Sequence, residues 1–94
     1  MTNLLDFTKT DYNQIRRSDR YGKKLSTREM DIIKLMGLGK SRQEIATELH
    51  ISPSTVRNQT VAIMDKLNVD SNLKIVIVYL TEEIPSNMIP NLSD

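Results

Sequence analysis

The chain has 94 residues, 38% of them hydrophobic and 27% charged, with a formal net charge of +1. This length fits one small domain, and the absence of cysteine excludes disulfide frameworks, iron–sulfur clusters and zinc fingers. One histidine, His50, does not support a metal site. There is no apolar run of about 18 residues to span a membrane, and the N-terminus lacks a secretory signal. We therefore expect a cytoplasmic protein with no evident metal, cofactor or small-molecule ligand.

The charges are unevenly distributed along the chain. Residues 1–24 carry six basic against three acidic side chains, whereas residues 68–94 carry one basic against four acidic. The basic segment 1–24 is interpreted either as an arm or docking segment that faces a polyanion, or as a solvated linker that happens to be charged.

The stretch 25–67 predicts three helices. Residues 26–29 and 41–44 both have the Ser-x-x-Glu spacing of a capping box. Ser52 followed by Pro53 is typical of a third helix start. A short helix, a tight turn and a longer helix make a helix-turn-helix outline, although any small helical bundle would give the same pattern.

Four motifs in this stretch carry a family resemblance: Leu25-Ser-Thr-Arg-Glu29, Glu44-Ile-Ala46, Ile51-Ser-Pro-Ser-Thr-Val-Arg57 and Ile63-Met-Asp-Lys-Leu-Asn-Val69. In this order they resemble the LuxR/FixJ-type (GerE-like) DNA-binding domain, over residues 25 to about 80. Sigma-factor region 4 is also similar, but the ending at 66–69 favours the LuxR type. The resemblance implies an all-α, four-helix helix-turn-helix domain over 25–84, standing alone behind a short N-terminal arm. The chain departs from the family pattern at Gln59, Asn68 and Ile75, where histidine, glycine and alanine are usual.

The resemblance also implies which residues contact DNA. With the third helix in the major groove, the base contacts are Arg57, Asn58 and Val61. Arginine can bind guanine O6 and N7, asparagine can bind adenine N6 and N7, and valine can touch a thymine methyl group. The expected phosphate contacts are Lys40, Ser41, Arg42, Ser54, Thr55, Gln59 and Lys66.

A fourth helix is expected over 73–84, followed by a flexible tail over 85–94 that contains two prolines. The run 75–80 has the composition of a buried strand, but a single strand after three helices would have no partner, and the resemblance implies a helix. We assign one apolar stripe to the core: Leu73, Val76, Ile77, Leu80 and Ile84. The other stripe would stay exposed: Ile75, Val78, Tyr79 and Glu82.

An exposed stripe of this kind indicates a contact surface. In LuxR-type domains this helix forms the homodimer, so the resemblance implies a two-fold dimer on an inverted repeat. The alternative is that residues 1–15 fold back over the stripe.

We therefore predict a sequence-specific transcription regulator that binds double-stranded DNA in the bacterial nucleoid as a homodimer. An enzyme is not expected, because no nucleophile–base set can be assembled. One alternative is an interaction protein that heterodimerises with a larger LuxR-type regulator or binds RNA polymerase without contacting DNA itself. Another is a protein that contacts only phosphates, which would bind DNA with a steep salt dependence and no sequence preference.

Overall fold

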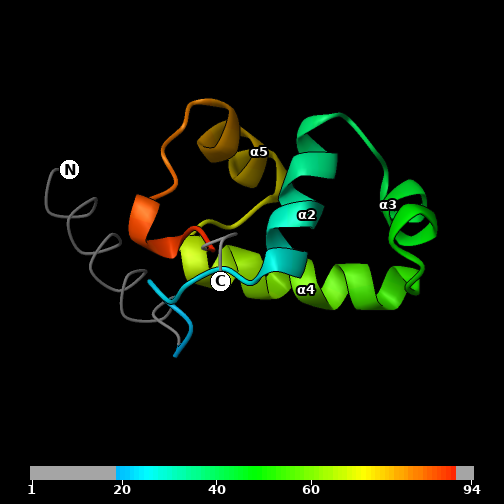
Figure 1. Ribbon diagram of the computed structural model, residues 1–94, viewed down its shortest axis with the longest axis horizontal. Coiled ribbons are helices and arrows are strands. Elements are labelled where there is room, and N and C mark those ends of the chain that lie inside the picture. Colours follow the sequence, from blue (N-terminus) through cyan, green and yellow to red (C-terminus); the bar gives the residue numbers. More distant parts are fainter. Residues whose placement is uncertain (1–18, 91–94) are drawn as a thin grey trace, which may run out of the picture.

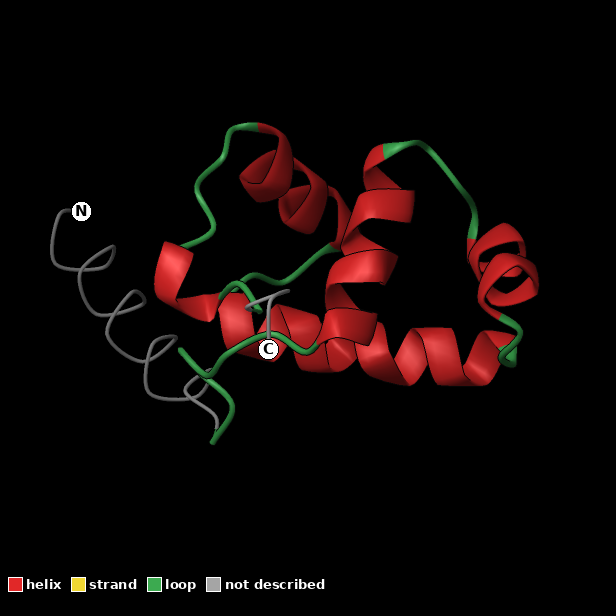
Figure 2. Ribbon diagram, viewed as in Figure 1, coloured by secondary structure: helices red, strands yellow, loops and turns green. Residues whose placement is uncertain are grey.

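The computed structural model describes residues 19–90 of the chain. Within these residues, four α-helices follow one another: α2 (Thr27–Gly37), α3 (Arg42–Leu49), α4 (Pro53–Leu67) and α5 (Asn72–Leu80), with a 3-10 helix, η1, at Ser86–Met88. No strand occurs between residues 19 and 90, so the predicted all-α fold is confirmed (Figure 2). The longest helix, α4, lies along one side of the molecule. α3 packs at its start, and α2 and α5 pack further along it (Figure 1).

Helices α2 and α3 begin with the predicted capping boxes. The hydroxyl of Ser26 accepts the Glu29 N–H at 3.0 Å, and the Glu29 carboxylate accepts the Ser26 N–H at 2.8 Å. The same reciprocal pair joins Ser41 and Glu44, at 3.2 and 2.8 Å. These bonds satisfy amides that have no partner inside the helix, so each helix start is determined by residues within four positions of it.

The core is aliphatic and receives side chains from all four helices α2 to α5. Its largest nearly inaccessible side chains are Leu25, Ile32, Ile33, Ile45, Ile63 and Ile75. Helices α2 and α5 approach each other closely at Gly37, because a Cβ atom there would lie 2.9 Å from Tyr79 Cε2. A side chain at this position would therefore force the Tyr79 ring to shift.

Helix α5 is shorter than predicted. It ends at Leu80 rather than at Ile84, and Glu82 has a φ of 57°, in the left-handed region that terminates a right-handed helix. Glu82 therefore lies in a turn and not on a helical stripe. Ile84 still reaches the core, where it is 9% exposed, but it does so from the turn that follows the helix.

Helix α5 is also rotated relative to the prediction. Ile75, assigned to the exposed stripe, is 0% exposed, and Val78 and Tyr79 are half-buried against the core. Conversely, Leu73, Ile77 and Leu80, all assigned to the core, are exposed. The assignment of the two stripes was wrong because both are apolar, so no polar face indicated how the helix is turned.

The segment after α5 packs on the core, although the sequence predicted a flexible tail from residue 85. Met88 is 4% exposed, and its carbonyl accepts the Leu25 N–H at 2.7 Å. This bond places the end of the described chain beside the beginning of the domain. Residues 91–94 of the predicted tail lie outside the described residues.

The segment 19–25 runs along the C-terminal end of α4 (Figure 1). Arg20 Nη1 is 3.0 Å from Asp65 Oδ2, and the Gly22 N–H donates to the Lys66 carbonyl at 3.1 Å. This part of the predicted basic arm is thus attached to the domain. Residues 1–18, which hold the rest of that arm and the predicted fold-back segment 1–15, lie outside the described residues.

Candidate nucleic-acid interface

Helices α3 and α4 form the helix-turn-helix pair. Helix α3 stops at His50, which has left-handed dihedral angles of 59° and 43°. The Ile51 N–H then donates to the Ala46 carbonyl at 3.0 Å, which closes the turn. Ser52 caps α4 by accepting the Thr55 N–H at 3.0 Å. The three-residue turn fixes the angle between the two helices through local hydrogen bonds.

One side of α4 is polar and exposed. The outer face of α4 consists of Ser54, Arg57, Asn58 and Val61, all of which are exposed. Its buried residues are Val56, Thr60 and Ile63. The three residues predicted to contact bases are all exposed, and Val61 lies three positions after Asn58 and four after Arg57, spacings that make it a neighbour of both on the helix surface. Their contact with DNA stays a prediction.

The start of α3 adds two cations near this face. Lys40, Ser41 and Arg42 are all exposed, as predicted for phosphate contacts. However, the Ser41 hydroxyl and N–H are both used in the capping box with Glu44. The Thr55 hydroxyl is likewise shared with Ser52, at 2.9 Å. The ammonium of Lys40 and the guanidinium of Arg42 are thus the groups best placed to meet a phosphate.

Glu44 is the acid next to these cations. Its carboxylate accepts the Ser41 backbone N–H, and this bond holds the pKa of Glu44 below its ordinary value. The Ser41 hydroxyl and the positive charge of Lys40 lower the pKa further. The carboxylate is therefore ionised at neutral pH and is directed at the helix N-terminus, where the dipole favours a negative charge.

Two predicted phosphate contacts lie elsewhere. Lys66 Nζ is 2.7 Å from Glu29 Oε1 and 3.0 Å from the Lys24 carbonyl, and its side chain is 15% exposed. Gln59 is half-buried, and its Oε1 is buried without a hydrogen-bond partner among the described residues. Gln59 and Lys66 are seven residues apart, so both lie on the same side of α4, away from its outer face. The ammonium of Lys66 is engaged inside the domain and the Gln59 oxygen is buried, so this arrangement does not support either phosphate assignment.

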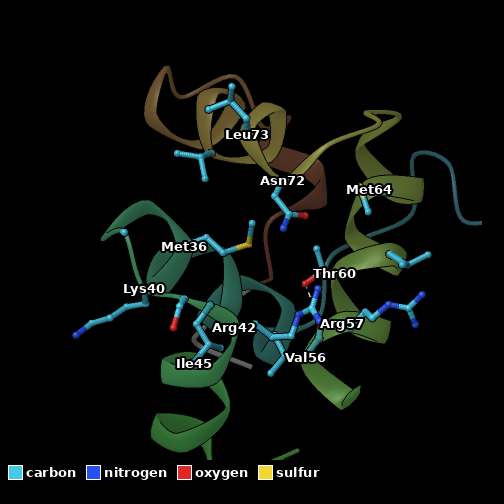
Figure 3. A pocket seen from close by; sticks show the side chains of 14 residues that line it. Met36, Lys40, Arg42, Ile45, Val56, Arg57, Thr60, Met64, Asn72 and Leu73 are labelled. Atoms are coloured by element: carbon cyan, nitrogen blue, oxygen red, sulfur yellow. Dashed lines mark hydrogen bonds between the residues drawn. The ribbon is translucent and has the colours of Figure 1, made fainter. Parts of the chain in front are cut away.

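A groove runs beside the outer face of α4. It encloses about 550 Å³ between the end of α2, the start of α3, α4 and the start of α5, and both Arg57 and Val61 line it. In Figure 3, Arg42 extends from α3 toward α4 and Asn72 points from α5 into the same space, whereas Lys40 and Arg57 point outward. Sequence reasoning missed Asn72 because it began the fourth helix at residue 73, whereas Asn72 is the first residue of α5 and Ser71 is its cap.

Comparison with known proteins identifies the domain. Residues 23–79, more than half of the chain, match the family described as bacterial regulatory proteins of the luxR family. The chain belongs to the LuxR family. The matched range contains α2, α3 and α4 completely and α5 up to its last residue but one.

Several bacterial regulators are similar to this LuxR-family chain. The transcriptional regulatory protein YvfU of Bacillus subtilis, described as uncharacterized, is 46% identical over 44 residues, which are 47% of this chain and 22% of that protein. The transcriptional regulatory protein DesR of the same organism is 38% identical over 52 residues, 55% of this chain and 26% of that protein. The response regulator protein VraR of Staphylococcus aureus is 35% identical over 65 residues, which are 69% of this chain and 31% of that protein. The chain thus spans less than a third of the length of these three relatives.

One departure from the LuxR-family pattern is explained by its geometry. Asn68, where glycine is usual, ends α4 with φ 57° and ψ 48°. Asparagine adopts this left-handed conformation more readily than most residues, so the helix end is kept. Between residues 19 and 90, no helix is long and apolar enough to cross a membrane, and no cluster of three or more candidate metal ligands occurs.

Proposed function

We propose that this chain is a sequence-specific DNA-binding transcription regulator that places α4 in the major groove. The observation that carries the proposal is the outer face of α4, where Arg57, Asn58 and Val61 are exposed side by side on the second helix of a helix-turn-helix pair. Membership of the LuxR family supports the same function. The guanidinium and the amide would bind base edges, and Val61 would touch a thymine methyl group.

The proposed phosphate contacts are fewer than the sequence predicted. Lys40 and Arg42 flank the outer face of α4 on one side, and Ser54 is exposed at the start of α4. Free amides in the first turn of α3 would add to their attraction for a phosphate. With Lys66 engaged by Glu29, few cations among residues 19–90 remain near this face, so we expect these residues to contribute only a shallow dependence of affinity on salt.

We further propose a two-fold dimer through α5, with a corrected set of contact residues. Leu73 is 68% exposed, Ile77 is 48% exposed and Leu80 is 61% exposed, and they lie on one side of the helix. Exposed apolar side chains that are adjacent on one helix favour contact with a second protein surface. An isologous dimer would present two copies of α4 to an inverted repeat.

The proposed function is tested by selecting binding sites from random duplex DNA and then titrating the enriched duplex. We expect an inverted repeat to be enriched. Arg57→Ala should weaken specific binding by about 1–3 kcal/mol, or about 5- to 150-fold. Lys34→Ala is the matched control, because it removes the same charge from an exposed position on α2 and should leave specificity unchanged.

The dimer is tested separately by sedimentation equilibrium. Ile77→Glu should convert the protein to a monomer while its circular dichroism spectrum stays helical, because Ile77 contributes little to the core. Lys34→Glu is the control, because it introduces an acidic side chain at an exposed position on α2, away from the proposed contact. A wild-type protein that is monomeric at all concentrations would contradict the dimer.

A second candidate function uses the same apolar side of α5. Its exposed leucines and isoleucine fit equally an interaction protein that heterodimerises with a larger LuxR-type regulator or binds RNA polymerase. If no sequence is enriched and weak binding is indifferent to Arg57, this second candidate replaces the first.

A further inference from the structure

The groove beside α4 has an apolar floor. Met36 from α2, Met64 from α4 and Val76 from α5 are half-buried along it, with buried Ile45 and Val56 beneath. The Thr60 hydroxyl in its wall already donates to the Val56 carbonyl at 2.7 Å, so it offers no free donor. Two methionines make such a surface adaptable to the shape of a ligand. The interior therefore favours an apolar body.

The rim of the same groove is positive. Lys40, Arg42 and Arg57 all belong to its lining, although the side chains of Lys40 and Arg57 point outward, and none of its lining residues in the described part of the chain is acidic. Arg42 and the amide of Asn72 approach the opening from opposite sides (Figure 3). A guanidinium and an amide N–H₂ are both donors that can bind one carboxylate or phosphate group. The rim therefore favours an anionic head.

We propose that this groove binds a small amphipathic anion, with the head between Arg42 and Asn72 and an acyl-like chain over Met36, Met64 and Val76. The volume of about 550 Å³ lies within the range of small-molecule sites, about 300–1,000 Å³. Charge complementarity selects an anion over a cation of the same length. The apolar floor selects a chain-bearing ligand over a bare anion.

The position of the groove gives the ligand a regulatory effect. Arg57 and Val61 line the groove and also belong to the outer face of α4. This regulatory effect rests on the proposed function. A bound anion would fill space that DNA needs and would engage cations that DNA phosphates would otherwise contact. Ligand and DNA would therefore exclude each other, so that the ligand releases the protein from its operator.

Ligand binding is tested without DNA, by NMR titration of the full chain with decanoate below its micellar concentration. We expect saturable shifts of the Met36 and Met64 methyl signals, with a Kd on the order of 1 mM or tighter. Arg42→Gln should weaken binding about tenfold, because a charge-assisted hydrogen bond is lost. Lys34→Gln, the matched loss of one charge outside the groove, should leave the Kd unchanged.

Three outcomes of this titration would overturn the proposal. Decyltrimethylammonium producing the same shifts would show that charge plays no part, and acetate binding equally well would show that the apolar floor plays none. Shifts confined to Ile77 and Leu80, which do not line the groove, would place decanoate on the exposed side of α5 instead. Asn72→Ala provides a second variant, on an exposed residue whose replacement leaves the core intact.

Competition is measured afterwards, by fluorescence anisotropy of the enriched duplex. Decanoate should displace DNA from the wild type, and about tenfold more should be needed with Arg42→Gln at equal DNA occupancy. Decanoate binding without any specific DNA binding would refute the proposed function and leave the site intact. Specific DNA binding that saturating decanoate does not affect would overturn the regulatory effect.

Discussion

Helices α4 and α5 are both partly buried, but only α4 has faces of different character. The outer face of α4 carries an arginine and an asparagine, and its inner side carries Val56 and Ile63. Seven of the nine residues of α5 are apolar or aromatic, and they surround the helix. Sequence reasoning placed Arg57, Asn58 and Val61 correctly on the exposed side of α4, but it also assigned Lys66 to that side and turned α5 incorrectly. Contrast between faces, rather than hydrophobicity itself, makes the orientation of a helix predictable.

The same contrast separates the proposed roles of the two helices. The exposed side of α4 is polar and carries a cation suited to a nucleic acid, whereas the exposed side of α5 carries Leu73, Ile77 and Leu80. An exposed surface of that composition is more suited to a protein partner than to phosphates. Substitutions on the two helices should therefore have different consequences.

The largest effect is expected within α5 itself. Ile75→Ala should lower the free energy of unfolding by about 2–5 kcal/mol, because Ile75 is 0% exposed and its loss leaves a cavity. Ile77→Ala should change the free energy of unfolding of the monomer by about 0.5 kcal/mol or less, because Ile77 is 48% exposed. Urea unfolding at low protein concentration measures both. Equal losses would contradict the observed rotation of α5.

The next comparison contrasts the two cations of α4. Lys66→Met should lower the free energy of unfolding by about 1.5–3 kcal/mol, because the carboxylate of Glu29, 9% exposed, loses a charged partner. Arg57→Met should leave stability unchanged and reduce specific DNA affinity. Urea unfolding measures the stability of both variants, and DNA titration measures their specific affinity. A loss of DNA specificity in Lys66→Met without a loss of stability would restore Lys66 to the DNA interface.

A smaller effect is expected where α2 meets α5. Gly37→Ala places a Cβ atom 2.9 Å from Tyr79 Cε2, and the ring must shift to accommodate it. Such overpacking costs about 1–3 kcal/mol, of which the better helix propensity of alanine offsets up to about 1 kcal/mol. Thermal unfolding should therefore show a lower Tm. A higher Tm would mean that the ring moves without cost.

The smallest effect is the pH dependence contributed by Glu44. Because its pKa in the folded state is lowered from 4.5, the ionised carboxylate stabilises the fold above that pH. This contribution is lost as the pH falls through the lowered value. Glu44→Gln should therefore be less stable than wild type at neutral pH, and the difference should shrink in acid. A difference that is independent of pH would show that the ionised form has no special role.

Features determined by nearby residues were predictable from the sequence. The serines that cap α2, α3 and α4 interact with residues three positions later, and all three helices begin where these patterns indicate. Lys66, by contrast, meets Glu29 across 37 positions, and no local pattern reveals such a partner. The end of α5 could not be predicted either, because no sequence pattern indicates that Glu82 adopts a left-handed conformation.

The contact between Leu25 and Met88 has a consequence for how this fold can be combined with other polypeptides. The two points where the chain enters and leaves the folded unit are adjacent, and the entry segment lies at the C-terminal end of α4, beside Lys66. Arg57 lies more than two turns away toward the other end of that helix. A neighbouring domain or a fluorescent tag attached at either point would therefore lie away from Arg57 and the proposed DNA-binding face of α4. The same adjacency suits the unit to circular permutation, with residues 25 and 88 bridged by a short loop.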